Sequence, residues 1–485
     1  MPSLFPAKLK FCYGVGHVLN DLTAAMWFSY MLIFMHKVVA FTNVNAGFII
    51  LAGQIADALA TTFVGYQSDT TVNVKYGRRK IWHLLGVICV AISFPFIFSL
   101  CISNCANSSP SSLMIYYIPF VVIFQFGWAS TQISHLSLIP EITTCEQGKV
   151  ELNAYRYFFT VLSNLIVFGV CFTLFQMNNT GTEALTKADA FKFQVLAVSM
   201  VGLGLLFMII FHVGVKEEPV GSLYSVSYGD EEATSLAASI QSVSCQKTIK
   251  SWFKTPLFYQ VGWLYMMTRL IVNVSQIYIS YFVLDSLKLP KSSIAIAPAI
   301  IYVSGILASI LAKLFNRKLG LKLTYLLGLC LITASSVWFY ELEELSSRFK
   351  FEAYGATVFL GMGGSTLLIV SLAMISEMID KNTDTAAFVY GSMSFLDKIS
   401  NGGAVMIIQY LQPCKSIPIC CKDCQEYFRY IMSLVPGSCA VLALICLLTL
   451  IKSPFGSFKK KEKILQNTKY GSLDSKFERN STIQS

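Results

Sequence analysis

The stretch Gly65-Tyr-Gln-Ser-Asp69, followed by Tyr76-Gly-Arg-Arg-Lys80, is a short polar connection between two long apolar runs. The runs on either side, Val44–Gln67 and Ile81–Ile102, are each close to the roughly 20 residues that cross a bilayer as a helix. Lysine and arginine in a short connecting loop are typical of the cytoplasmic side of a membrane. The stretch therefore predicts two transmembrane helices joined on the cytoplasmic side.

The same pattern continues along the chain of 485 residues, of which 54% are hydrophobic and only 13% charged. A soluble chain of this length needs far more charged surface, so the composition favours a membrane protein. The net charge of +10 therefore does not indicate binding to nucleic acid. In a membrane protein it reflects lysines and arginines gathered on the cytoplasmic side. We predict an all-α membrane protein of twelve transmembrane helices, at Phe11–Val38, Val44–Gln67, Ile81–Ile102, Met114–Pro140, Leu152–Gln176, Phe193–Val215, Leu257–Leu284, Ser293–Phe315, Leu323–Tyr340, Tyr354–Ile379, Ala386–Leu411 and Phe428–Ile451.

Positive charge is concentrated in alternate loops. The loops after the second and eighth spans and the C-terminal tail are rich in lysine and arginine, whereas the loop between the third and fourth spans has neither. Both termini should therefore face the cytoplasm. Asn107 and Asn178 each begin a glycosylation sequon, and both fall in loops that this orientation places on the lumenal side.

A polar, serine-rich segment divides the chain. We predict a six-helix half over residues 1–215, a cytoplasmic linker over 216–255, a second six-helix half over 256–451 and a cytoplasmic tail over 452–485. Asn316-Arg-Lys-Leu-Gly320 follows the eighth span as the polar connection follows the second, which indicates a weak internal repeat. Two such halves, with a Gly-x-x-x-Asp…Gly-Arg-Arg loop, resemble the major facilitator superfamily. We expect Asp69, Arg78 and Arg79 to form a structural gate rather than to contact a substrate.

Ionisable residues occur near the middle of several predicted spans. A charge at the bilayer centre costs at least about 2.5–3.5 kcal/mol, so each one needs a reason. Counted along their helices, five of them lie at one depth: Asp21, Asp57, Arg269, Asp397 and Lys398. The first half supplies acidic groups and the second half supplies the basic ones. We therefore predict a substrate or cation site at this depth, between the halves.

Two polar residues share helix faces with these charges. Thr61 lies one turn from Asp57, and Asn273 lies one turn from Arg269, so both join the predicted site. The alternative is that the charges are structural ion pairs, which is strongest for Arg269 because arginine is a natural static partner of a carboxylate. Asp397 should face the cavity less well than Lys398, since neighbouring side chains on a helix point about 100° apart.

Other polar residues in the spans have simpler interpretations. His17 lies on the same face of the first span as Asp21. We expect His135 and Gln132, in the fourth span, to be packing or gating residues. Arg156, near the cytoplasmic end of the fifth span, could extend its charged end to the membrane surface.

The first span resembles that of a family of cation-coupled sugar carriers. Tyr13-Gly-Val-Gly-His…Asn20-Asp21 is similar to the first helix of the glycoside–pentoside–hexuronide:cation symporters. Asp57 and Lys398 fall where that family has a cation-site aspartate in helix two and a lysine in helix eleven. Its second helix-two aspartate falls at Thr61, and its helix-four aspartate falls at Gln132. The resemblance implies a coupled carrier that has lost half its sodium-site carboxylates, and we expect a proton on Asp57 to be the coupling ion.

Longer motifs resemble a narrower family, the vertebrate melanosomal and lysosomal cysteine importers. The similar stretches are Gly14–His17 through Asn20–Leu22, Met26–Phe28, Ser93–Phe98, Thr268–Asn273, Phe388–Phe395 and the cysteine spacing after Pro413. The resemblance implies import of L-cysteine from the cytosol into lysosomes and melanosomes, with the plasma membrane as the alternative location. These buried charges suit a zwitterionic substrate, because Asp21 or Asp57 could hold its ammonium group and Lys398 or Arg269 its carboxylate.

Other function classes remain open. A sugar or lysolipid carrier could use the same charged residues through hydrogen bonds. These residues therefore do not distinguish between the substrate classes. A non-transporting receptor or scaffold has no need of charges at the bilayer centre, which speaks against it. An enzyme is not expected, since the sequence shows no motif for an activated catalytic nucleophile and no group of residues spaced to bind a metal ion. No cofactor or metal is predicted.

Four cysteines crowd one loop on the predicted lumenal side: Cys414, Cys420, Cys421 and Cys424. Disulfides are predicted, because the lumen is separated from the reducing cytosol. A zinc site is the alternative, although adjacent cysteines suit chelation poorly. Cys101 and Cys105 could pair with this cluster or with each other.

The C-terminal tail contains Tyr470-Gly-Ser-Leu473, a tyrosine followed three residues later by a bulky apolar residue. Clathrin adaptors bind such tetrapeptides as extended segments, with one pocket for the ring and one for the apolar side chain. The motif lies in a segment predicted to be cytoplasmic, where an adaptor can reach it. We therefore expect Tyr470 and Leu473 to act as an endolysosomal sorting signal.

Overall fold

The computed structural model describes residues 6–71, 75–101, 109–143, 146–177, 185–217, 249–342, 349–379, 385–413, 422–451 and 455. Several predicted residues lie outside these ranges: Asn107, Asn178, Cys414, Cys420, Cys421, Tyr470 and Leu473. Cys424 lies in the first turn of the last helix, and Cys101 is disulfide-bonded. Every regular element within the described ranges is a helix.

The first half of the chain begins with a continuous span over Ala7–Val38. This span is built from α1 (Ala7–Gly14), η1 (Val15–His17), α2 (Val18–Ile33) and η2 (Phe34–Val38). The helices that follow it are α3 (Asn43–Thr70), α4 (Arg78–Ile97), α5 (Pro110–Ser137), α6 (Ile139–Ile142), α7 (Glu146–Met177), η4 (Lys187–Asp189) and α8 (Ala190–Gly214).

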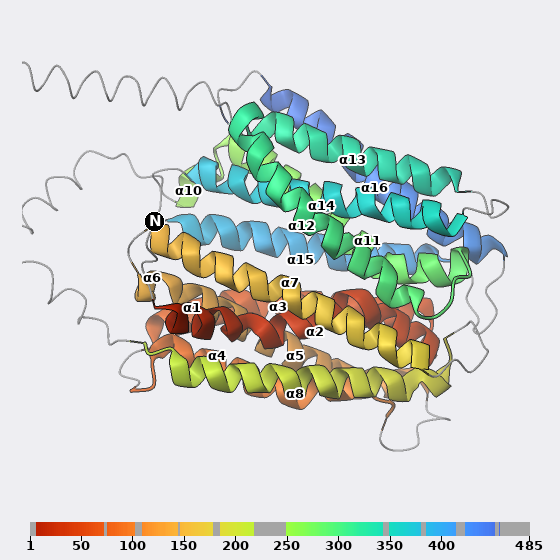
Figure 1. Cartoon of the computed structure of the whole chain (residues 1–485), viewed down its shortest axis with the longest axis horizontal. Helices are drawn as coiled ribbons and strands as arrows, with labels where there is room; N and C mark the ends of the chain where they lie inside the picture. Colours follow the sequence, from red (N-terminus) through yellow and green to blue (C-terminus); the bar gives the residue numbers. More distant parts are fainter. Residues whose placement is uncertain are drawn as a thin grey trace, which may run out of the picture.

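The second half repeats this plan, and in Figure 1 its green and blue helices lie above the red to yellow helices of the first half. A short helix, α10 (Ile249–Trp252), leads into it. Its elements are α11 (Pro256–Tyr281), η5 (Phe282–Ser286), α12 (Ser293–Leu319), α13 (Leu321–Glu341), α14 (Phe349–Ile379), α15 (Ala386–Leu411) and α16 (Lys422–Leu450).

Eleven helices within the described ranges are long and apolar enough to cross a membrane. The predicted eleventh span, α15, is a helix of 26 residues that is not among them. Its polar residues, Asp397, Lys398 and Asn401 among them, lower its mean hydropathy, yet all three are buried in the bundle. They are buried because α15 packs against α3 and α11. The twelve predicted spans are therefore all present as long helices.

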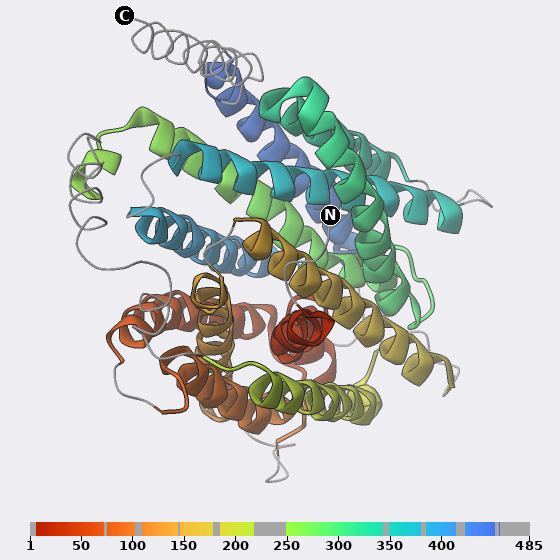
Figure 2. The same ribbon diagram turned by 60° about the vertical axis from the view of Figure 1, so that its left-hand side comes forward.

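Among the described helices, three pairs with extensive packing join the two halves. These pairs are α2 with α11, α3 with α15 and α7 with α12, and the view in Figure 2 separates the two groups of helices. Thr70 and Arg78, from the loop predicted to be cytoplasmic, lie at the end of the bundle that also holds the start of α1. We call this the cytoplasmic end and the opposite one the lumenal end.

Glycine permits a close contact between α4 and α5 in the first half. A Cβ added at Gly86 would lie 2.6 Å from the carbonyl oxygen of Gly127, and one added at Gly127 would lie 2.8 Å from that of Gly86. Small residues at such positions let helix backbones approach closely in a membrane, where packing rather than the hydrophobic effect drives association. The pair fixes α4, and with it Arg78 and Arg79 at the start of that helix.

The first span of each half ends in the same way at the lumenal end. The α-helix becomes a five-residue π-helical turn, η2 or η5, and a residue with positive φ follows: Ala40 at 67° and Lys288 at 48°. The backbone hydrogen bonds also match, since Val39 donates to Phe34 and Leu287 donates to Phe282, both at 3.0 Å. Positive φ is rare outside glycine, so its recurrence shows that the internal repeat extends to local geometry.

Candidate transport site

A cavity of about 270 Å³ lies between the two halves. Its walls come from α2 and α7 of the first half and from α11, α12 and α14 of the second. The polar residues that line it are Asp21, Tyr157, Thr160, Asn164, Arg269, Asn273, Ser275, Gln276, Tyr302 and Ser365. Asp21, Arg269 and Asn273 among them are predicted site residues, so this cavity contains opposite charges from opposite halves.

Asp21 is held at the cavity wall by residues of the first half. The Thr160 hydroxyl donates to its Oδ2 at 2.9 Å. His17 Nδ1 lies 3.0 Å from its Oδ1, although that N–H is poorly aligned for a hydrogen bond. Arg156 Nη2 lies 3.2 Å from the other ring nitrogen of His17. Arg156 therefore points inward to His17, and the expectation that it extends to the membrane surface is wrong.

Arg269 reaches the cavity from α11 while bound to α15. Its Nε donates to Asp397 Oδ2 at 2.8 Å, and Asn273 and Asn401 both donate to Asp397 Oδ1, at 3.3 and 2.6 Å. Asp397 is 4% exposed, so a carboxylate there needs these donors. The structural ion pair that the sequence offered as the alternative for Arg269 is thus formed, and its partner lies in the same half.

Asp57, Thr61 and Lys398 meet between α3 and α15. Lys398 Nζ donates to Asp57 Oδ1 at 2.6 Å and also to the Thr61 hydroxyl. Thr61 donates to the same Asp57 oxygen at 3.2 Å. Asp57 and Lys398 are only 3% and 6% exposed, so each charge depends on the other. This pair crosses from the first half to the second.

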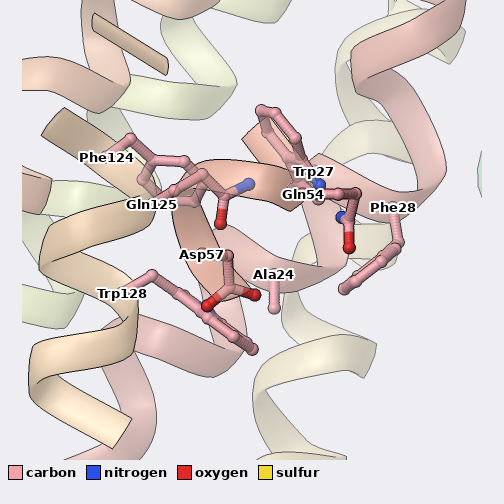
Figure 3. Close-up of a pocket in the computed structure, with 8 residues that line it drawn as sticks. All are labelled: Ala24, Trp27, Phe28, Gln54, Asp57, Phe124, Gln125 and Trp128. Carbon is pink, nitrogen blue, oxygen red and sulfur yellow. The ribbon is translucent and has the colours of Figure 1, made fainter. Parts of the chain in front are cut away.

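The surroundings of Asp57 differ from those of the central cavity. Figure 3 shows its carboxylate beside the indole of Trp128, with Trp27, Gln54 and Gln125 nearby. The volume of this pocket is about 10 Å³, which is at the lower limit for one water molecule. A small ion or a proton fits this pocket, and an amino acid does not. Ala24 and Phe28 line both spaces, so α2 separates them.

The predicted gate residues form a network at the cytoplasmic end. Arg78 and Arg79 both donate to Glu141 Oε1, at 2.7 and 3.1 Å, and Arg79 also binds Asp69. Glu217 accepts from the backbone N–H groups of Arg79 and Lys80, both at 3.0 Å. Asp69, Arg78, Arg79 and Glu141 belong to the first half, and Glu217 lies at the start of the segment predicted to be the linker. The network therefore ties the start of that segment to the first half.

Glu217 and Gly77 form the centre of this network. Gly77 has φ 111°, and a Cβ there would lie 2.3 Å from Glu217 Oε2. Glu217 caps the N-terminus of α4, where the helix dipole favours a negative charge. Burial nevertheless raises the pKa of the Glu217 carboxyl above its ordinary value. Neither Glu141 nor Glu217 was predicted, because each is an isolated acidic residue near a helix end, which alone is common on a soluble surface.

Ion pairs join the halves at the lumenal end. Lys37 Nζ lies 2.9 Å from Asp285 Oδ2. Lys291 Nζ lies 2.7 Å from Asp189 Oδ2, and Lys192 binds the other oxygen of Asp189 at 3.1 Å. These residues were not predicted from the sequence, since they lie at span ends, where charged residues are common.

A family model described as "MFS/sugar transport protein" matches residues 12–455. The chain belongs to this family. It is therefore a multi-pass transport protein of the major facilitator superfamily, related to symporters. The predicted fold is confirmed.

Two curated relatives of this transporter cover nearly its whole length. "Major facilitator superfamily domain-containing protein 12" of Homo sapiens is 43% identical over 468 residues, which are 93% of this chain and 95% of that protein. Its counterpart in Mus musculus is 43% identical over 466 residues, with the same coverage. A crystal structure of the D-xylose-proton symporter has a TM-score of 0.66 at 14% identity, and covers 90% of this chain and 96% of that one. That likeness shows the fold.

Proposed function

We propose that this transporter imports L-cysteine from the cytosol into lysosomes and melanosomes by alternating access. The observation that carries the proposal is the central cavity, where Asp21 of the first half and Arg269 of the second line one space. Opposite charges on opposite walls suit a small zwitterion. The resemblance to cysteine importers favours cysteine among the small amino acids. It also favours lysosomes and melanosomes as the location.

The proposed binding mode uses the two walls separately. Asp21 receives the substrate ammonium, steadied by Thr160 at 2.9 Å. Arg269 receives the carboxylate. Within the described residues its hydrogen bond to Asp397 uses Nε, which leaves the Nη groups available, and a guanidinium binds carboxylates with parallel N–H donors. Asn273 lines the same wall.

The proposed cycle follows from the contacts between halves. The ion pairs Lys37–Asp285 and Asp189–Lys291 hold the lumenal end together. Release of substrate to the lumen requires them to separate, while the halves rock about the central site. Lys398 must also leave Asp57, and a proton on Asp57 removes the charge that holds it. We infer that a proton is the coupling ion.

An apolar groove favours a second candidate, a carrier of lysolipid or another amphiphile. The groove has a volume of about 660 Å³ and lies between α7 and α12. Phe172, Val303 and Leu307 in its walls are exposed. Phe168 and Tyr302, with ring centroids 5.5 Å apart, stand between this groove and the central cavity. The acyl chain of such a lipid could lie in the groove while its charged headgroup lies in the central cavity.

Uptake by the purified protein in proteoliposomes tests the proposal. We expect uptake of labelled L-cysteine that excess unlabelled cysteine abolishes and that D-xylose or a lysophospholipid leaves unchanged. Arg269→Gln should lower uptake by about tenfold or more, the effect of losing a hydrogen bond to a charged group. Arg429→Gln is the matched control, because Arg429 is a partly buried arginine of α16 outside the cavity lining. Competition by lysophospholipid and not by cysteine would replace the proposal with the second candidate.

A further inference from the structure

The first transmembrane span is interrupted beside the central cavity. The 3₁₀ turn η1 separates α1 from α2 and ends at His17. Backbone carbonyls at such a break need donors from neighbouring helices. His135 Nε2 donates to the carbonyl oxygen of Tyr13 at 2.9 Å. His83 Nε2 donates to the carbonyl oxygen of Gly16, also at 2.9 Å. These two histidines therefore hold the turn that places His17.

We propose that His17 is a positioning residue of the central site. As a neutral ring with its proton on Nδ1, it steadies the Asp21 carboxylate and keeps Arg156 away from it, so that Asp21 stays free for the ammonium group of a substrate. The inference rests on the proposed function, because it concerns the same ammonium site. It implies that the transporter selects substrates with a primary ammonium group over those that offer only a carboxylate or a hydroxyl.

Arg156 of α7 fixes the position of the His17 proton. Its Nη2 lies 3.2 Å from His17 Nε2. A guanidinium only donates, so Nε2 must accept, and the neutral ring then carries its proton on Nδ1. A doubly protonated ring would direct a second N–H at the guanidinium, where two positive charges would also repel each other. Arg156 therefore favours one tautomer of the neutral ring.

The proton on Nδ1 faces Asp21. Nδ1 lies 3.0 Å from Asp21 Oδ1, with the N–H poorly aligned for a hydrogen bond, so the contact is between a dipole and a charge. The Thr160 hydroxyl donates to the other carboxylate oxygen, Oδ2, at 2.9 Å. His17 is 4% exposed and Asp21 is 7% exposed, and a carboxylate so deeply buried needs such donors. Both donors are neutral, so neither cancels the negative charge of Asp21.

This charge sets Asp21 apart from the other two aspartates predicted at the bilayer centre. Lys398 binds Asp57 at 2.6 Å. Arg269 binds Asp397 at 2.8 Å. Within the described part of the chain, Asp21 has no such ion pair with a lysine or an arginine. A charge in the membrane interior without a counter-ion is costly. The ammonium group of a substrate would supply the missing cation.

His17 also stands between Asp21 and Arg156. One of its ring nitrogens faces the guanidinium and the other faces the carboxylate. Without the ring, the guanidinium could approach the carboxylate directly and form a bidentate pair. That pair would occupy the oxygens that the ammonium group of a substrate needs. A protonated His17 would have the same effect, because it would itself be the counter-ion of Asp21.

Inhibition by two thiols tests the role of His17. Cysteine and 3-mercaptopropionate share a thiol and a carboxylate, but only cysteine has an ammonium group. In proteoliposomes, His17→Leu should raise the KM for cysteine about tenfold or more, the effect of losing a donor to a charged group. The inhibition constant of 3-mercaptopropionate should change by less than about twofold, because its binding does not involve Asp21.

Two further variants serve as controls. His17→Asn places an amide N–H where Nδ1–H was, and should keep the KM for cysteine within about threefold of the wild type. His36→Leu is the matched control, because His36 is a buried histidine of η2 outside the cavity lining. It should leave the ratio of the two constants unchanged.

An equal rise of both constants in His17→Leu indicates a structural role and contradicts the proposal, and so does an unchanged KM for cysteine. A wild-type protein that takes up no cysteine refutes the proposed function instead, and a measurement without substrate then decides on His17. In solid-state NMR of the full chain with 15N-labelled histidine, the His17 ring is the signal that is lost in His17→Asn. We expect a neutral ring with its proton on Nδ1, and a shift toward the Nε2–H tautomer in Arg156→Met. A doubly protonated ring or an Nε2–H tautomer in the wild type overturns the proposal.

Discussion

Lys37 and Asp285, whose Nζ and Oδ2 atoms lie 2.9 Å apart, occupy the same place in the two halves of the molecule. Each is the fourth residue of a five-residue π-helical turn, and each lies three residues before the residue with positive φ. A lysine and an aspartate therefore meet at equivalent positions of an internal repeat. The repeat brings them together, and their opposite charges join the halves.

The first prediction concerns this pair. Asp285→Asn should shift the transporter toward a conformation that is open to the lumen, because Lys37 loses its partner across the halves. Spin-label distances between the lumenal ends of α4 and α13 measure the shift. The exchanged pair Lys37→Asp with Asp285→Lys should restore the original distances, since the positions are equivalent.

A control separates this effect from a general loss of ion pairs. Glu151→Gln removes the partner of Lys10, at 2.8 Å within the first half, and should leave the lumenal distances unchanged. If Asp285→Asn gives the wild-type distances, the pair does not hold the lumenal end closed.

The second prediction concerns the buried pair of α3 and α15. Lys398→Ala leaves the Asp57 carboxylate unpaired at 3% exposure, which should cost about 3–5 kcal/mol of stability. Thermal unfolding in detergent measures the loss. Asp57→Asn combined with Lys398→Met should recover most of the stability while uptake stays absent. Near-normal uptake in Asp57→Asn, Asp21→Asn and Lys398→Ala would remove these charges from the mechanism.

The third prediction concerns Gly77. Gly77→Ala places a side chain at φ 111°, and its Cβ meets the Glu217 carboxylate at 2.3 Å. The strained backbone alone should cost about 1–3 kcal/mol. A lowered melting temperature of the purified protein checks this. Gly65→Ala, where nothing lies within 4 Å of the added Cβ, is the control, and an equal effect of both substitutions would contradict the role of Glu217.

The fourth prediction is the orientation in the membrane. Asn107 and Asn178 should carry glycans, and a cysteine introduced in the linker over 216–255 should react with a cytosolic maleimide. A glycosidase shift that is lost only in Asn107→Gln with Asn178→Gln supports this orientation. Labelling of the linker from the lumen would reverse the sidedness of transport.

The fifth prediction is the sorting signal. Tyr470→Ala should move the protein from lysosomes toward the plasma membrane, because the adaptor pocket loses its ring. Cysteine uptake by intact cells should then become measurable. Tyr470→Phe is the control, since it keeps the ring but lacks the hydroxyl. Full retention of the alanine variant in lysosomes would show that the tail motif is not the signal.

The cost of charge in a bilayer made the main polar residues predictable. Asp57, Lys398 and Arg269 stand out in apolar runs, and the structure places Asp57 against Lys398. The sequence could not predict that these charged residues divide between two separate spaces. The position of a residue along its helix gives its depth in the membrane, but not the direction in which that face of the helix points within the bundle. Arg269 consequently pairs with Asp397, and Asp57 lies outside the central cavity.

Residues with ordinary sequence surroundings escaped prediction. Glu141, Glu217 and Asp189 lie near helix ends, where acidic residues are common and carry no signal of their own. Each of them has a partner more than 60 positions away, as Glu141 has in Arg78 and Asp189 has in Lys291.

The neighbouring residues Asp397 and Lys398 give α15 a double attachment. Asp397 fastens the helix to α11 of its own half, whereas Lys398 fastens it to α3 of the other. When the halves separate, the first bond travels with α15 and the second must break. Neutralising Asp57 releases the second bond without weakening the first. We therefore propose that α15 is a releasable clamp between the halves, which protonation of Asp57 opens while the helix stays joined to α11.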